Sequence, residues 1–144
     1  MSGTNGIEKL FAAETFKALF HHADCFAIVG EPTQLELAIA EKGLMVLDCT
    51  ANGKPGHAAR EEGENALYKA MEAINWFRQY EFEKLSPTLG KIKMTVTSVF
   101  TENKAHNVVP ATCNFTVDVR ITDVYSHEEI LEEIKKQVQV EVKP

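Results

Sequence analysis

The segment from Ala111 to Thr122 constrains the fold of this chain most, because apolar and polar side chains alternate along its whole length. Such alternation is typical of a strand with one buried face and one polar face, as in an antiparallel sheet covered on one side. The predicted buried face consists of Cys113, Phe115, Val117, Val119 and Ile121, and the polar face of Thr112, Asn114, Thr116, Asp118 and Arg120.

The neighbouring segments supply partners for this strand. Strands are expected at 44–49, 91–100 and 139–142, and helices at 66–77 and onward from the capping box Ser126–Glu129. The order strand, helix, strand, strand, helix, strand indicates an α+β fold of the ferredoxin-like, split βαβ type. We therefore expect an antiparallel sheet with both helices on one face.

The N-terminal part of the chain follows a different pattern. An amphipathic helix is expected around Ile7–Phe20, followed by the wholly apolar run Cys25–Val29. Continuous apolar strands are typical of parallel sheets that are covered on both faces. Because no second strand of this kind follows, residues 1–41 are interpreted as a helix-strand remnant of a larger α/β domain.

Composition excludes several classes of partner. The chain has 15 Lys and Arg against 21 Asp and Glu, a formal net charge of −6, which argues against nucleic acid. No apolar run approaches the roughly 20 residues that a membrane helix needs. The three cysteines are widely spaced and the start of the chain lacks the features of a signal peptide, so a cytoplasmic protein with reduced thiols is expected.

His57 is the first candidate for chemistry. It lies in a loop with Gly53, Pro55, Gly56 and Gly63, residues that restrict the chain or let backbones approach closely. An imidazole held in this way can donate a hydrogen bond to a developing negative charge. The alternative interpretation is a solvent-exposed loop histidine.

Three further residues are weaker candidates. Glu31 directly follows the apolar run, where a carboxylate can bind a metal or substrate, or simply form a Glu-Pro turn. Asn107 precedes a strand and offers one donor and one acceptor group, or only begins that strand. Arg120 lies on the polar strand face, where it forms an ion pair with Asp118 or binds a substrate carboxylate.

Together these stretches resemble the middle of the dizinc deacylase family, which includes acetylornithine deacetylase, succinyl-diaminopimelate desuccinylase, aminoacylase and glutamate carboxypeptidase. The acetylornithine deacetylase branch is the most similar. The matching stretches occur in the family's order: Val29–Thr33, Glu41–Gly43, Gly53–Ala59, Gly63–Ala66, Asn107–Pro110 and Asp118–Arg120.

The resemblance implies a domain organisation and a set of roles. Residues 1–41 would be a segment of the catalytic domain, 42–140 the lid or dimerisation domain, and 141–144 the start of the return to the catalytic domain. His57 would reach into the partner subunit's site to stabilise the tetrahedral oxyanion. Asn107 and Arg120 would hold the substrate, Arg120 by its carboxylate, and Glu31 would be a terminal zinc ligand.

The resemblance also implies a complete enzyme with two zinc ions, a homodimer formed through the lid domain, and a small N-acyl amino acid as substrate. N-acetylornithine, and hence arginine biosynthesis, is the nearest example. The family's upstream His-x-Asp, bridging Asp and Glu-Glu pair and its downstream His are absent from this sequence. This chain alone is therefore expected to be inactive and to bind no zinc tightly, while the acyl group and the amino acid stay open.

Two alternatives do not require catalysis. The first is a stand-alone, ferredoxin-like dimeric module that binds a small molecule, onto which residues 1–40 pack as an extension. The second is a purely structural assembly domain, which leaves His57 and Arg120 without a role.

Overall fold

The computed structural model describes residues 7–20, 28, 30 and 36–144. The chain divides into two compact units, Met1–Ala38 and Ile39–Pro144, which are described separately. The first unit contains the helices α1 (Ile7–Ala12) and α2 (Glu14–Phe20). Of the predicted strand Cys25–Val29, only Ile28 belongs to the described residues, and Glu31 lies outside them as well.

The prediction of one continuous helix over Ile7–Phe20 is wrong, because the helix is interrupted at Ala13. The Ala13 amide donates to the carbonyl of Leu10, three residues back, at 3.2 Å. This tighter turn ends α1. The carbonyl of Ala13 then accepts the first hydrogen bonds of α2, from Phe16 at 2.9 Å and Lys17 at 3.0 Å.

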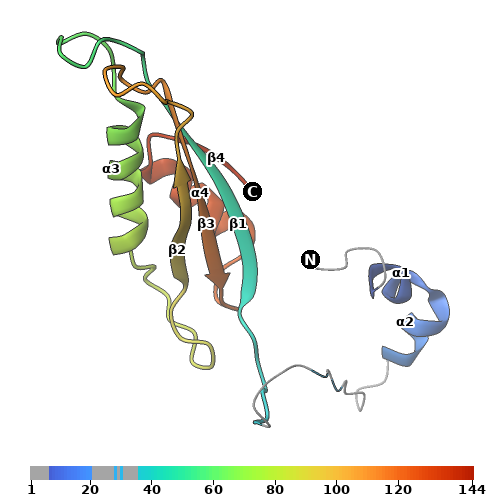
Figure 1. The fold of residues 1–144 in the computed structure, drawn as a ribbon. Helices are drawn as coiled ribbons and strands as arrows, with labels where there is room; N and C mark the ends of the chain where they lie inside the picture. The colour runs from blue at the N-terminus through green and yellow to red at the C-terminus, as the bar shows by residue number, and fades with distance from the viewer. Residues whose placement is uncertain (1–6, 21–27, 29, 31–35) are drawn as a thin grey trace. The chain divides into compact units, whose positions relative to one another are not determined.

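The second unit has the predicted α+β architecture (Figure 1). Its elements are β1 (Gly43–Asn52), α3 (Ala66–Gln79), β2 (Lys93–Phe100), β3 (Thr112–Ile121), α4 (His127–Gln137) and β4 (Glu141–Lys143). The strand order is β2-β3-β1-β4, and every neighbouring pair is antiparallel. Both helices lie on the same face of the sheet, which confirms the ferredoxin-like, split βαβ prediction.

The core forms between that face of the sheet and the two helices. The alternation predicted for β3 is confirmed, since its five apolar side chains are at most 4% exposed. β1 faces them with its own alternating residues, and the helices close the layer. The residues that these elements add are Met45, Leu47, Cys49 and Ala51 from β1, Ala66, Ala70, Ala73 and Phe77 from α3, and Ile130 and Ile134 from α4.

The helix predicted at 66–77 has an apolar stripe, and one of its positions, Met71, is not in the core; the stripe consists of Ala66, Leu67, Ala70, Met71, Ile74 and Phe77. Met71 is 56% exposed, whereas Ala73 is 5% exposed. The buried stripe steps by four, three and four residues through Ala66, Ala70, Ala73 and Phe77. Met71 lies one residue beyond Ala70, about 100° further around the helix, and this rotation takes its side chain off the sheet.

Side-chain caps define where both helices begin. Asn65 Oδ1 accepts a hydrogen bond from the Leu67 amide at 2.9 Å at the start of α3. The capping box predicted for α4 is confirmed: Ser126 Oγ accepts from the Glu129 amide at 3.1 Å, and Glu129 Oε2 accepts from the Ser126 amide at 2.8 Å. The cap at Asn65 matters for the site, because the loop that carries His57 ends there.

The aromatic contact between α3 and β3 yields a stability prediction. Phe77 is 2% exposed, and its ring meets Phe115 edge to face at 6.0 Å. Phe77→Ala should lower the free energy of unfolding by about 3–5 kcal/mol, as measured by urea denaturation. Tyr68→Ala on the same helix, where the side chain is 64% exposed, should change it by no more than about 0.5 kcal/mol. Equal losses in the two variants would contradict the assigned core.

Candidate functional site

The loop between β1 and α3 is a folded structure rather than an open connection. Lys54 and Glu64 exchange two backbone hydrogen bonds, at 2.9 and 2.8 Å. The ends of the loop are tied to the chain that enters β3: the Gly53 amide donates to Ala111 O at 2.8 Å, and the Ala66 amide donates to Pro110 O at 3.1 Å. His57 therefore lies on a braced scaffold.

Close backbone contacts explain the glycines in this loop. A Cβ atom on Gly53 would lie 2.2 Å from Glu64 O, and a Cβ on Gly56 would lie 2.2 Å from Glu62 O. Gly63 has φ of +101°, a conformation that residues with side chains rarely adopt. Glycine therefore permits the close backbone approach that was expected around His57. In each case the backbone that comes close belongs to the opposite arm of the same loop.

The fold brings His57 and Asn107 together. His57 forms an antiparallel bridge with Val108. The Ala58 amide donates to Asn107 O at 2.9 Å, and the Val109 amide donates to Gly56 O at 2.8 Å. Figure 1 shows the two loops, between β1 and α3 and between β2 and β3, at the same end of the sheet.

The imidazole of His57 is exposed and held by one hydrogen bond. Its Nδ1 accepts from the Ala59 amide at 3.2 Å. A nitrogen that accepts a hydrogen bond carries no proton, so in the neutral ring the proton lies on Nε2. Nε2–H is therefore the donor that His57 presents to a ligand, and the amide of Ala59 selects this tautomer.

The loop that carries Asn107 depends on a residue that the sequence analysis missed. Asn103 Nδ2 donates to Val108 O at 2.8 Å, and its Oδ1 accepts from the Ala105 amide at 3.3 Å. Asparagine often bonds to nearby backbone in turns, and that tendency is the signal that was available. The side chain of Asn107 itself is exposed and, within the described part of the chain, forms no hydrogen bond.

Arg120 is not brought to His57. It pairs with Leu44 near the start of β1, whereas the His57 loop follows the end of that strand. Ten residues of strand span about 30 Å. The guanidinium makes a bidentate contact with Asp118, with Nε to Oδ1 at 2.8 Å and Nη2 to Oδ2 at 3.1 Å, and this carboxylate raises the pKa of Arg120.

Metal and thiol chemistry find little support in the described residues. Within 7–20, 28, 30 and 36–144, no three His, Cys, Asp or Glu side chains come together in a way that would hold a metal ion. These residues therefore do not form a zinc site. Burial raises the pKa of the Cys49 thiol to about 12 and also raises that of Cys113, which makes both poor nucleophiles. None of the described helices has the length and apolar composition that a membrane crossing requires.

The fold and the braced histidine loop define a class, the ferredoxin-like α+β module that presents loop side chains at one end of its sheet. Residues 39–144, more than half of the chain, match the family described as "Peptidase dimerisation domain". The chain belongs to this family, which confirms the resemblance drawn from its motifs.

Curated relatives carry hydrolase names. Succinyl-diaminopimelate desuccinylase 2 of a Ruegeria species is 28% identical over 140 residues, 93% of this chain and 34% of the relative. Succinyl-diaminopimelate desuccinylase of Cereibacter sphaeroides is 32% identical over 69% of this chain and 28% of its own length. Acetylornithine deacetylase of Myxococcus xanthus is 32% identical over 82% and 31%. The chain thus spans about a third of the length of these relatives.

Solved structures share the fold. A putative amidohydrolase/peptidase from Burkholderia cenocepacia superimposes with a TM-score of 0.55 at 19% identity, over 72% of this chain and 27% of that one. An amidase of the hydantoinase/carbamoylase family from Burkholderia multivorans superimposes with a TM-score of 0.52 at 18% identity, over 72% and 26%. The similarity concerns the fold alone.

The close contact at Gly56 yields a test of the loop. Gly56→Ala places a methyl group against the carbonyl of Glu62, so it should lower the free energy of unfolding by about 1–3 kcal/mol and shift the NMR signals of His57 and Val108. Gly43→Ala is the matched control, because its Cβ would lie 3.6 Å from Ile121 Cβ, an ordinary contact. An unchanged His57 signal in Gly56→Ala would show that the loop is not braced as described.

Proposed function

We propose that this chain is the lid and dimerisation part of a cytoplasmic, zinc-dependent amide hydrolase that removes the acyl group from a small N-acyl amino acid. The observation that carries the proposal is the braced loop that presents Nε2–H of His57 beside Asn107. The names of the relatives support it, since they describe a desuccinylase and a deacetylase. N-acetylornithine, and with it a role in arginine biosynthesis, is the substrate we propose to assay first.

The proposed domain division follows from the same reading. Residues 1–41 would belong to the catalytic domain, with Glu31 as a zinc ligand there, and 42–140 would form the lid. Residues 141–144 would begin the return to the catalytic domain. Three of them, Glu141–Lys143, form β4 and pair with β1. The compact unit Ile39–Pro144 supports a boundary near residue 40.

His57 would act on the oxygen of the scissile amide. When a nucleophile attacks the carbonyl carbon, negative charge develops on that oxygen, and a donor already in place stabilises it. Nε2–H is such a donor, and the Ala59 amide removes the need to select a tautomer during the reaction. Because the described residues form no zinc site, zinc and Glu31 are proposed for the complete enzyme only. This role of His57 is independent of how the nucleophile arises.

The separation of His57 from Arg120 argues for two subunits at each site. A small N-acyl amino acid cannot span the length of β1, so one copy cannot hold it with both residues. Among the described residues, the outer edge of β2 has no strand partner. β2 begins beside Arg120 and ends at Phe100, near the His57 loop.

Antiparallel pairing of two β2 edges would reverse one copy with respect to the other. The partner's His57 loop would then lie at the end of the joined sheet that holds Arg120. A substrate would be bound by its carboxylate at Arg120 of one subunit and by its acyl group at His57 and Asn107 of the other. Arg120 would release Asp118, or share it, when a substrate binds.

The role of His57 is tested in the complete enzyme. His57→Ala should lower kcat about 10²–10³-fold, as loss of an oxyanion donor does, while the zinc content stays unchanged. His106→Ala is the matched control, because His106 is also an exposed loop histidine at that end of the sheet. Normal turnover by His57→Ala would refute the oxyanion role.

The isolated 144-residue chain with added zinc should not hydrolyse N-acetylornithine, and turnover by that chain would contradict its assignment as a lid.

The proposed dimer is tested at the β2 edge. Val99 and Phe100 are 53% and 57% exposed, and a lysine on an edge strand opposes strand pairing. Val99→Lys and Phe100→Lys should each weaken the dimer at least about tenfold, or 1.4 kcal/mol, in sedimentation equilibrium. Glu132→Lys is the control, because Glu132 is exposed on α4, away from that edge. Equal dimerisation by all three variants would place the interface elsewhere.

A further inference from the structure

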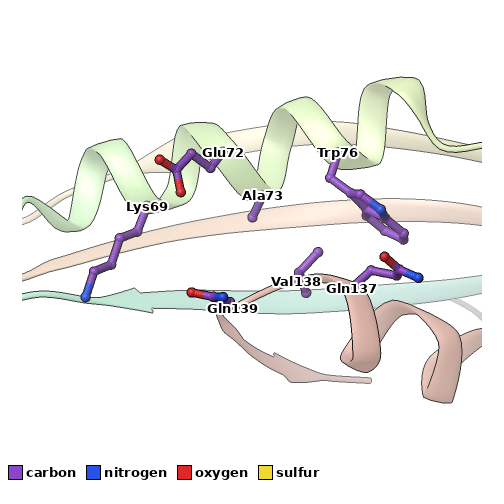
Figure 2. Close-up of a pocket in the computed structure, with 7 residues that line it drawn as sticks. All are labelled: Lys69, Glu72, Ala73, Trp76, Gln137, Val138 and Gln139. Atoms are coloured by element: carbon purple, nitrogen blue, oxygen red, sulfur yellow. The ribbon is translucent and has the colours of Figure 1, made fainter.

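A hollow of about 210 Å³ lies between α3 and the connection from α4 to β4 (Figure 2). It is formed on the helix-covered side of the unit, and neither His57 nor Asn107 nor Arg120 lines it. Lys69, Glu72, Ala73 and Trp76 reach it from one face of α3, at the spacing of successive helical turns. The small side chain of Ala73 leaves the space open in the middle of this face.

The polar groups around the hollow retain bonding capacity. Within the described part of the chain, the side chains of Glu72 and Gln139 have no hydrogen bond or ion pair. Lys69 Nζ donates to Asn52 O at 3.1 Å and to Glu64 Oε2 at 2.6 Å. An ammonium group has three donors, so one is left. Glu72 and Gln139 are exposed, and the lining is polar rather than apolar, which suits a charged ligand.

We propose that the hollow binds a free α-amino acid that carries a second cationic group at the end of its side chain. The remaining donor of Lys69 would bind the α-carboxylate, and the carboxylate of Glu72 would bind the α-ammonium. Residues three apart on a helix have Cβ atoms about 5–6 Å from each other. In Figure 2 the Lys69 ammonium extends toward the strand and the Glu72 carboxylate stays beside the helix, so both side chains would turn toward the α-amino acid when it binds.

Trp76 would select the side chain of the bound amino acid. It lies four residues beyond Glu72, about 6 Å along the helix, which is the reach of a three- or four-carbon side chain. One face of its indole ring stacks on Tyr80, with the ring centroids 4.5 Å apart, and the other face is left for a cation–π contact. Gln137 lies beside this ring. Its Nε2 donates a hydrogen bond to Glu133 Oε1 at 3.0 Å, and its side-chain carbonyl oxygen remains available as an acceptor.

Charge and size disfavour other ligands. The Glu72 carboxylate would repel a simple anion, and the Lys69 ammonium would repel a simple diamine. An apolar molecule would leave both charged groups without partners. The volume of about 210 Å³ exceeds the roughly 150 Å³ of an engineered cavity that binds benzene, which is enough for a compact amino acid such as lysine or ornithine. The inference does not rest on the proposed hydrolase activity, because none of its residues would contact the substrate in that mechanism.

The chain's single tryptophan makes the test direct, because Trp76 is the only indole fluorophore. Titration of the 144-residue chain with L-lysine and with L-ornithine should give a saturable fluorescence change, with Kd on the order of 1 mM. L-norleucine, which lacks the terminal ammonium, and 1,5-diaminopentane, which lacks the carboxylate, should each bind at least about tenfold more weakly, or 1.4 kcal/mol. A change that rises linearly with ligand and matches that of sodium chloride would overturn the proposal.

Glu72→Gln should raise the Kd for L-lysine at least about tenfold, because it removes the charge that binds the α-ammonium. Glu132→Gln is the matched control on α4, where the side chain is exposed and outside the hollow. Both substitutions are at exposed positions, and identical urea denaturation curves would confirm that both variants fold. Equal affinity in Glu72→Gln, Glu132→Gln and the unmodified chain would overturn the site, while leaving the His57 assignment untouched.

Discussion

The antiparallel pairing of β1 with β3 is the interaction on which the rest of the structure depends. It runs from Gly43 opposite Ile121 to Asn52 opposite Thr112 without a break. Both strands alternate, so a slip of one residue would turn every apolar side chain of one strand to the solvent. The same pairing joins the end of β1 to the start of β3 and thereby brings the loops of His57 and Asn107 together. It also places Arg120 at the far end of the sheet.

The two proposed sites meet at Lys69. The ammonium of this residue joins the last residue of β1, Asn52, to the side chain of Glu64 in the His57 loop. The hydrogen bond from Lys69 lowers the pKa of Glu64. The helix that forms one wall of the hollow thus also supports the loop that presents the imidazole. A ligand in the hollow would contact the ammonium group that braces this loop.

The sequence predicted the elements better than their relations. The strand at Ala111–Thr122 and the capping box at Ser126 are local patterns, and both are confirmed. Ala13 breaks the predicted N-terminal helix and Met71 leaves the core, because a single residue's hydrogen bond or rotation decides these details. The hollow was not predicted, since it depends on how α3 packs against residues 137–139, which come from a distant part of the sequence.

By itself, the sequence determined which residues of β3 face the core, where α4 begins, and that the backbone must approach closely around His57. Local periodicity, capping chemistry and the absence of a Cβ atom are sufficient for these properties. Only the tertiary structure decided that His57 lies beside Asn107 and a whole strand length from Arg120. Strand order and register result from the sum of contacts between segments distant in the chain, and no local pattern encodes that sum.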